Sequence, residues 1–369
     1  MLVEGKYYQS IWLDESDPAV VRVIDQNRLP FFFEIKELHS VEDIFNAIKD
    51  MTIRGAPLIG AAAAFGVYLA TLEIITTTNS RQHLDNAARY LISCRPTAVN
   101  LSRAVNYVMD KLTGDTPGQS ISEIARRAAL EFCEEEKEHC RQIGRYGLPL
   151  IEELSKNKGG GPVNILTHCN AGWLACIDYG TATSPIYLAH EAGIPVHVWV
   201  DETRPRNQGA RLTAWELGQA DIPHTLITDN TGGHLMQHGM VDIVIVGSDR
   251  TTRRGDVANK IGTYLKALAA SDNGIPFYSA FPSTTFDFTI SDGLSEIPVE
   301  EREPEEVTVV EGLSGNKTEH VRICPVNTRS ANYAFDVTPA KLITGLITEK
   351  GICKPAEKDI KKMFSDKFK

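Results

Sequence analysis

The sequence predicts an α/β protein with a Rossmann-like parallel sheet in a C-terminal domain and a smaller, mostly helical N-terminal domain that carries a short β element. Three observations support this prediction. Apolar runs recur in the second half of the chain, stretches of helical length separate them, and helical patterns dominate the first 150 residues. Alternating β and α elements of this kind form a parallel sheet covered by helices on both faces. We therefore divide the chain into residues 1–150 and 151–369.

The N-terminal domain is expected to begin with short strands and turns over residues 7–35. A helix should follow from residue 41, because Ser40 is a favoured N-cap and two acidic residues come next in the first turn. Four further helical patterns cover residues 58–76, 80–94, 97–113 and 119–141. The 58–76 stretch approaches membrane-spanning length, but its many Ala and Gly residues and its Glu73 favour a buried helix.

Five apolar runs predict strands in the C-terminal domain, at residues 163–168, 195–202, 224–228, 241–249 and 275–280. The segments between them have helical length and cover residues 172–193, 207–220, 232–240 and 256–271. In open parallel sheets the functional site lies beyond the carboxyl ends of the strands. Polar residues follow the runs at those ends: His168, Cys169, Asp201, Glu202, Asp229 and Asp249.

The composition is that of a globular protein, and it argues against several functions. The net charge is -10, whereas a general nucleic-acid binder carries a basic surface. The seven cysteines form no CxxC pair, so neither a disulfide framework nor a zinc ribbon is indicated. The first residues lack the basic and apolar regions of a signal peptide. We expect a cytoplasmic protein with reduced thiols that binds neither nucleic acid nor membranes.

Two residues at strand ends are candidates for proton transfer. Cys169 lies between a predicted strand and Gly172, and a helix N-terminus nearby would favour its thiolate. The alternative is a small, buried core residue. Asp249 ends an apolar strand, where burial would raise its pKa and suit it to general acid–base catalysis. Capping of the next helix or pairing with Arg250 is the alternative.

Other motifs could bind an anion, although each has a structural explanation as well. The RGAP sequence places Arg54 and free N–H groups at the start of a helix of small residues, and a tight turn would look the same. Arg95 lies between two helices, where a surface ion pair is the simpler interpretation. Asn259 and Lys260 are expected at the start of a helix, and Gln208 lies in a charged loop. P-loop and GxGxxG sequences are missing after the predicted strands, which favours cofactor-free proton transfer on a sugar phosphate.

The order of the motifs along the chain is specific: RGAP, RPTAVNL, THCNAG, DETRPRNQGARLTAWEL, GSDR and VANKIGTY. This order resembles the methylthioribose-1-phosphate isomerases, within the larger family that includes ribose-1,5-bisphosphate isomerase and the regulatory subunits of the eukaryotic initiation exchange factor. The likeness covers residues 8–352. It implies a homodimeric isomerase of methionine salvage that acts on a sugar phosphate without metal or organic cofactor.

The resemblance also implies roles for individual residues. Cys169 and Asp249 match the catalytic pair of the family. The substrate and phosphate contacts match Arg54, Gly55, Ala56, Arg95, Gln208, Asn259 and Lys260. The initiation-factor subunits lack the signatures around the catalytic pair, so their presence here favours an enzyme over a sugar-phosphate- or nucleotide-sensing subunit.

Some positions depart from the family pattern, and these bear on the choice of substrate. They include residues 171–173, Ser248, the sequence of 330–339 and the segment at 309–330, which we expect to be longer than is typical of the family. We expect several of them to line the pocket for the 5-substituent. A hydrophobic pocket discriminates a missing small apolar group by only about 1–3 kcal/mol, so 5-deoxyribose 1-phosphate is an alternative substrate. Ribose 1,5-bisphosphate would need additional cationic side chains for its second phosphate.

Overall fold

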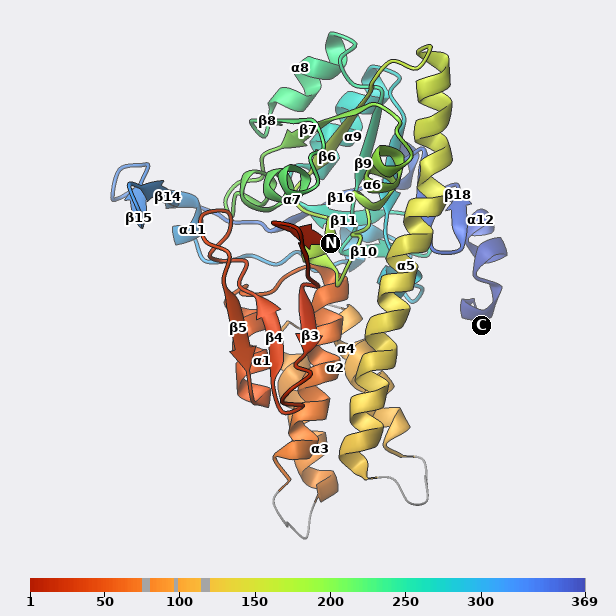
Figure 1. Cartoon of the computed structure of the whole chain (residues 1–369). Coiled ribbons are helices and arrows are strands. Elements are labelled where there is room, and N and C mark those ends of the chain that lie inside the picture. The colour runs from red at the N-terminus through yellow and green to blue at the C-terminus, as the bar shows by residue number, and fades with distance from the viewer. Residues whose placement is uncertain (75–79, 96–98, 114–119, 369) are drawn as a thin grey trace.

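The computed structural model describes residues 1–74, 80–95, 99–113 and 120–368. Figure 1 shows a helical N-terminal half joined to a sheet-containing C-terminal half, with the long helix α5 (Ile121–Asn157) running along both. Phe132 of α5 packs in the core of the N-terminal half, whereas Ile143 and Ile151 pack in the core of the C-terminal half. The division proposed at residue 150 therefore falls inside a helix that belongs to both cores.

The N-terminal half contains the short β element and the helices that the sequence predicts. Its strands are β1 (Leu2–Val3), β2 (Lys6–Tyr7), β3 (Ile11–Leu13), β4 (Val21–Ile24) and β5 (Ile35–Leu38). Its helices before α5 are α1 (Val41–Lys49), α2 (Ala56–Leu72), α3 (Ser80–Ser93) and α4 (Val99–Lys111). Ser40 caps α1 by accepting the Asp43 N–H. Helix α2 is buried along nearly its whole length, as expected for this Ala-rich stretch.

Three predicted helical stretches extend beyond the described ranges, at residues 75–76, 97–98 and 119. Helix α5 continues past the predicted end at residue 141 to Asn157, and Pro149 lies within it without ending it. Within the described part of the chain, no helix is both long and apolar enough to span a membrane.

The C-terminal half is built on a seven-stranded sheet with the order β18-β17-β12-β9-β6-β7-β8. Its strands are β6 (Val163–His168), β7 (Val196–Asp201), β8 (His224–Ile227), β9 (Ile243–Val246), β12 (Phe277–Ala280), β17 (Gly345–Thr348) and β18 (Gly351–Cys353). All neighbours are parallel except the edge pair of β17 and β18. The first five strands confirm the five predicted runs. This is the predicted Rossmann-like sheet.

Helices connect the strands, but two of the predicted helical segments are partly wrong. The helices are α6 (Ser184–Glu191), α7 (Ala214–Gln219), α8 (Thr231–Gln237) and α9 (Thr263–Asp272). Most of 172–183 is a buried loop with one 3-10 turn, since Tyr179 and Gly180 adopt positive φ angles that a helix excludes. Asn259 and Lys260 lie on strand β11 (Val257–Lys260), not at the start of a helix.

A second sheet and a projecting hairpin were not predicted. The sheet has the order β13-β10-β11-β16, with β10 (Arg250–Thr252), β13 (Phe286–Asp287) and β16 (Phe335–Thr338) beside β11. The hairpin pairs β14 (Val309–Ser314) with β15 (Lys317–Arg322) and extends away from the body in Figure 1. The remaining short helices are α10 (Gly293–Glu296), α11 (Glu305–Thr308) and α12 (Glu357–Met363).

Candidate active site

The order of the strands places a cavity at the carboxyl edge of the large sheet. The chain proceeds from β6 to β7 and β8 on one side, and then returns to β9 on the other side of β6. Parallel sheets leave a crevice where their strand order reverses in this way. Cys169 directly follows β6, and Asp249 lies just beyond β9. Both therefore lie at the crevice, as predicted from their positions after apolar runs.

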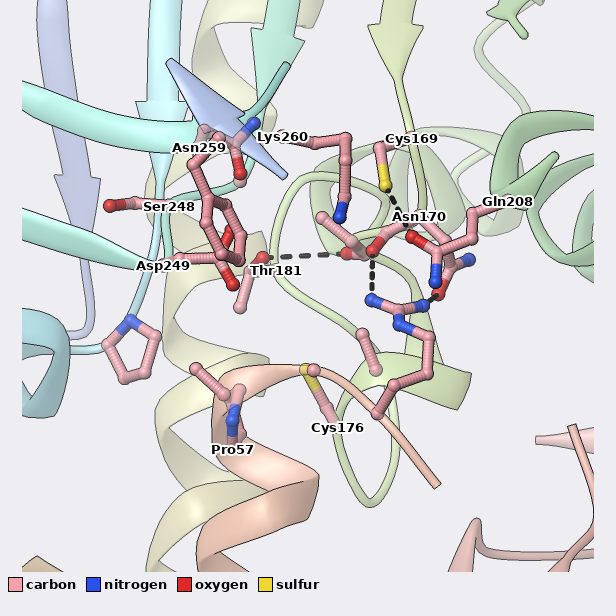
Figure 2. A pocket seen from close by; sticks show the side chains of 18 of the residues that line it. Pro57, Cys169, Asn170, Cys176, Thr181, Gln208, Ser248, Asp249, Asn259 and Lys260 are labelled. Atoms are coloured by element: carbon pink, nitrogen blue, oxygen red, sulfur yellow. Dashed lines mark hydrogen bonds between the residues drawn. The ribbon is translucent and has the colours of Figure 1, made fainter. Parts of the chain in front are cut away.

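The cavity is lined by both halves of the chain. Figure 2 shows side chains from the sheet edge facing those at the start of α2 across it. The structure brings all nine residues of the predicted site into its wall: Arg54, Gly55, Ala56, Arg95, Cys169, Gln208, Asp249, Asn259 and Lys260.

Cys169 has an unusual backbone conformation, with φ of +64°. This left-handed geometry is uncommon for a residue with a side chain, and it ends strand β6. The Thr213 hydroxyl donates a hydrogen bond to the Cys169 carbonyl at 2.6 Å, which helps to hold the turn. The expected helix N-terminus beside the thiol is wrong, because a 3-10 turn follows and α6 begins only at Ser184.

The surroundings of Cys169 keep its thiol protonated at rest. Burial raises the pKa of the thiol, while the positive charges of Lys260 and Arg54 oppose that rise. The thiol donates a hydrogen bond to Gln208 Oε1 at 3.1 Å (Figure 2). The nearby cations would stabilise the thiolate once a proton has left, so this group can both give and take a proton.

Asp249 is a carboxyl group suited to donate a proton. Desolvation raises its pKa, although Lys260 and Arg95 counteract part of the rise. The two structural alternatives for this residue do not hold. Arg250 faces Asp287 at 3.6 Å instead, and the residues after Asp249 form strand β10 rather than a helix. The Asp249 N–H donates to the Ala258 carbonyl at 2.9 Å, which fixes the residue against β11.

The three cations of the cavity are held in different ways. Arg54 donates to the side-chain and main-chain oxygens of Asn170 at 2.5 and 2.7 Å, and so fixes the residue after Cys169. Arg95 forms an ion pair with Glu300 at 2.8 Å. Lys260 lies over the Phe335 ring at 4.8 Å, and burial lowers the pKa of its ammonium group. Lys260 is therefore the cation best placed to meet an incoming anion.

The start of α2 adds backbone groups to the same wall. Gly55 has a φ of +96°, and a Cβ built there would lie 2.4 Å from the Ala175 carbonyl oxygen. Only glycine allows this close approach between the two halves of the chain. The RGAP sequence is therefore both a tight junction and part of the cavity, so the two explanations offered for it hold together.

Sequence reasoning missed several residues of the wall, and it misplaced others. Asn170 was in a quoted motif but had no assigned role, although it orients Arg54, whereas Phe335, which covers Lys260, lies in the departing segment 330–339. Among the departures from the family pattern, Ala171 and Ser248 line the cavity. Trp173 does not, because it is fully buried in the core against Trp215. Residues 309–330 do not line the cavity.

Glu216 is a buried carboxyl group behind the cavity, and we expect it to make stability depend on pH. Burial raises its pKa to about 7, and its Oε1 accepts the Leu174 N–H at 2.7 Å. Because the folded state holds this proton more tightly than the unfolded state, stability is highest below the unfolded pKa and is lost as pH rises to about 7. The loss should reach about 3 kcal/mol.

The substitution Glu216→Gln should remove most of this pH dependence, since an amide can accept the same N–H without ionising. Urea unfolding at pH 5, 6, 7 and 8 measures it. The exposed Glu15→Gln serves as the control and should leave the wild-type slope unchanged. An unchanged slope in Glu216→Gln would show that Glu216 ionises normally in the folded protein.

The fold and the cavity together define a class of protein. The Rossmann-like sheet presents a thiol and a carboxyl group, both with raised pKa values, beside cationic side chains. This is a site for acid–base chemistry on a small anionic molecule. The described ranges hold no group of three or more His, Cys, Asp or Glu side chains that could bind a metal ion.

Comparison with known proteins identifies the family. The sequence pattern of the initiation factor 2 subunit family matches residues 52–355, and the chain belongs to this family. The methylthioribose-1-phosphate isomerase of Desulfatibacillum aliphaticivorans is 56% identical over 369 residues, which is the full length of both chains. The enzyme of the same name from Sinorhizobium medicae is 55% identical over 369 residues, again the full length of both.

Solved structures share the fold. The 5-methylthioribose 1-phosphate isomerase from Pyrococcus horikoshii OT3 is 38% identical, with a TM-score of 0.85 over 98% of this chain and 97% of that one. A structure described as translation initiation factor eIF-2B, subunit delta, from A. fulgidus is 39% identical, with a TM-score of 0.79 over 97% of this chain and all of that one.

Proposed function

We propose that this protein is an aldose–ketose isomerase that converts 5-methylthioribose 1-phosphate to 5-methylthioribulose 1-phosphate in methionine salvage. One observation carries the proposal. The Cys169 thiol and the Asp249 carboxyl group face one cavity beside cations, in a chain 56% identical over its full length to a relative named for this reaction. Both proton carriers are present, which favours an enzyme over a sensing subunit.

Ring opening is the first step, and Asp249 supplies its proton. The phosphate on C1 blocks spontaneous opening to an aldehyde, so the ring oxygen must be protonated while the C1–O bond breaks. A carboxyl group with a raised pKa carries that proton at a higher pH than an ordinary aspartic acid does. Asp249 is left as a carboxylate, which Lys260 and Arg95 stabilise.

Hydrogen then moves from C2 to C1, and Cys169 carries it. The reactive form is the thiolate, which the resting thiol gives when it loses its proton to solvent; it removes the proton from C2, and the electrons of that C–H bond form the C1–C2 double bond of an enol phosphate. The resulting thiol returns a proton to C1, while the C2 hydroxyl loses its proton to the Asp249 carboxylate and becomes the ketone. Both groups end in their starting protonation states. Lys260 and Arg54 stabilise the thiolate during the transfer.

The cationic side of the cavity holds the phosphate. Lys260 and the N–H groups at the start of α2 are suited to bind its oxygens. Arg54 is already engaged with Asn170, so it contributes charge and keeps the residue beside Cys169 in place. Binding of the phosphate holds C1 and C2 near the thiol, and this positioning lowers the barrier to proton transfer.

A direct comparison of substrates tests the proposed function. The purified protein is incubated separately with 5-methylthioribose 1-phosphate, 5-deoxyribose 1-phosphate and ribose 1,5-bisphosphate, and the ketose products are followed by NMR. Turnover of the methylthio compound is expected. Preference for the 5-deoxy compound would place the protein in 5-deoxypentose salvage. An absence of turnover on all three would favour a sugar-phosphate- or nucleotide-sensing subunit.

The path of the hydrogen can be followed with deuterium. If Cys169 transfers a proton, reaction in D₂O should place solvent deuterium on C1 of the product, because a thiol exchanges its hydrogen with water. The position of the label is read by NMR. Full retention at C1 of a deuterium that starts on C2 would contradict the thiolate route and indicate a direct hydride shift.

We also propose that the protein acts as a cytoplasmic homodimer. All seven cysteines are free thiols, which suits a reducing compartment. The projecting hairpin exposes apolar side chains such as Leu313 and Val321, and a two-stranded ribbon of this kind is marginal without a partner surface. Light scattering after size-exclusion chromatography measures the mass, and a monomer would contradict this proposal.

A further inference from the structure

We propose that His168 is a positioning residue, which holds the Cys169 thiol at a fixed distance from the Lys260 ammonium group. The inference rests on the proposed function. His168 ends strand β6 and directly precedes Cys169. Its Nε2 lies 2.8 Å from the carbonyl oxygen of Ile261, the residue directly after Lys260. One buried side chain therefore joins the neighbour of the thiol to the neighbour of the ammonium group.

This link matters because the thiol and the ammonium group belong to different sheets, although both point into one cavity (Figure 2). Cys169 follows β6, which pairs with β7 and β9, whereas Lys260 ends β11, which pairs with β10 and β16. Strand pairing within either sheet therefore does not set the distance between them. Asp249 has its own connection to β11, because its N–H donates to the Ala258 carbonyl at 2.9 Å. His168 provides the corresponding connection for Cys169.

A buried carboxylate orients the imidazole ring from its other side. His168 Nδ1 lies 2.6 Å from Asp201 Oδ2, and both side chains are fully buried. Lys266 of α9 lies 2.8 Å from the same oxygen and so holds Asp201 in place. A carbonyl oxygen can only accept a hydrogen bond, so Nε2 carries the hydrogen that it donates to Ile261. Asp201 thus keeps this hydrogen directed at the end of β11.

Loss of this link should impair the chemistry more than the binding of substrate. Gly262 passes so close to the imidazole that a Cβ built there would lie 3.1 Å from His168 Cε1. A shorter side chain at position 168 leaves a gap here, and the end of β11 can then move relative to β6. A misplacement of about 1 Å can lower a rate by about 10²-fold. Lys260 and the start of α2 remain able to bind the phosphate.

Two amides test the two sides of the imidazole separately. In His168→Asn the amide takes the position of Nδ1 and can donate to Asp201, but it ends short of Ile261. In His168→Gln the amide takes the position of Nε2 and can donate to the Ile261 carbonyl. Ser184→Ala is the control, because it removes a buried 2.8 Å hydrogen bond from the Ser184 hydroxyl to the Cys140 carbonyl, outside the cavity wall. We compare kcat and KM on 5-methylthioribose 1-phosphate, and urea unfolding measures the stability of each protein.

We expect His168→Asn to lower kcat by about 10²-fold and to change KM by less than about threefold, whereas His168→Gln should keep kcat within about tenfold of the wild type. Ser184→Ala should lower stability but leave kcat within about twofold. A merely structural role for His168 would instead make the loss of activity follow the loss of stability in all three variants.

The reactivity of the thiol provides a second readout. Burial raises the pKa of Cys169, and the charge of Lys260 opposes that rise. A thiol displaced from Lys260 should therefore react with iodoacetamide at higher pH in His168→Asn than in the wild type, with the modified residue identified by mass spectrometry. Arg54 and Asp249 also face the thiol, and both are unchanged in the variants.

Equal losses of kcat in His168→Asn and His168→Gln, or a change in KM alone, would overturn the inference, while turnover by the wild type would leave the proposed function intact. The wild type offers a test that needs no variant. A ¹⁵N NMR spectrum of histidine-labelled protein should show the Nε2 hydrogen of His168 protected from exchange, and an Nε2 without hydrogen would also overturn the inference. If the wild type did not turn over 5-methylthioribose 1-phosphate, the proposed function would fail, and the alkylation and NMR readouts would still decide whether His168 holds the thiol beside Lys260.

Discussion

Replacing Cys169 by serine should lower kcat on 5-methylthioribose 1-phosphate by about 10³-fold or more, because a hydroxyl is far less acidic than a thiol and cannot serve as the base. The thiol is also expected to shape the pH profile. Since burial raises its pKa above the ordinary value, the thiolate fraction grows with pH, and kcat of the wild type should rise with pH until Asp249 loses its proton. Steady-state kinetics between pH 6 and 10 measure both effects.

Cys176→Ser is a suitable control for this substitution. Cys176 is buried and also lines the cavity, but the hydrogen bond to Gln208 belongs to Cys169. We expect Cys176→Ser to change kcat by less than about tenfold and to keep the wild-type pH profile. Circular dichroism and light scattering should show both variants folded and in the wild-type oligomeric state. A folded Cys169→Ser variant with a nearly normal rate would remove the thiol from the mechanism.

Replacing Asp249 by asparagine should have a comparably large effect, with a loss of about 10³-fold or more in kcat/KM. The amide keeps the shape of the side chain but has no proton to give to the ring oxygen. Above the raised pKa of Asp249, loss of its proton should cancel the gain from thiolate formation, so wild-type activity should level off there, whereas the residual activity of the variant should keep rising with pH. The pH profile therefore distinguishes loss of the proton donor from a simple loss of binding.

The order of the two steps provides a second readout for Asp249→Asn. If ring opening comes first, the closed sugar has no acidic hydrogen on C2, and substrate recovered from D₂O should contain no deuterium there. Asp249→Glu, which keeps the carboxyl group but shifts it by one methylene, should retain more activity than Asp249→Asn. Equal losses in the two variants would assign Asp249 a structural role instead.

The main sheet and the composition of the cavity followed from local patterns in the sequence. Five apolar runs became β6, β7, β8, β9 and β12, because all of these strands except the edge strand β8 are largely buried, and buried strands leave a strong signal. Functional sites lie beyond the carboxyl ends of parallel strands, and this rule selected Cys169 and Asp249. The family motifs supplied the remaining residues. These predictions depend on features that a few neighbouring residues specify.

The predictions that were wrong concern features fixed only by tertiary contacts. Asn259 and Lys260 belong to a four-residue strand that pairs with β10 and β16, and so short a segment resembles a helix start in sequence. The loop at 172–183 is apolar because it is buried, not because it is helical. The apolar cavity beside the catalytic one could not be predicted from the sequence, since Ile59, Ala258 and Ile297 come together only when both halves of the chain have folded.

The left-handed backbone at Cys169 implies an asymmetry in how this protein can change over time. Glycine is at ease at a φ of +64°, whereas a side chain costs about 1 kcal/mol there. A mutation of Cys169 to glycine would therefore abolish catalysis and at the same time remove this backbone strain. Loss of catalysis then costs no stability, and the inactive protein keeps its fold and its cavity. Such a route would connect an enzyme with proteins of the same architecture that lack its chemistry.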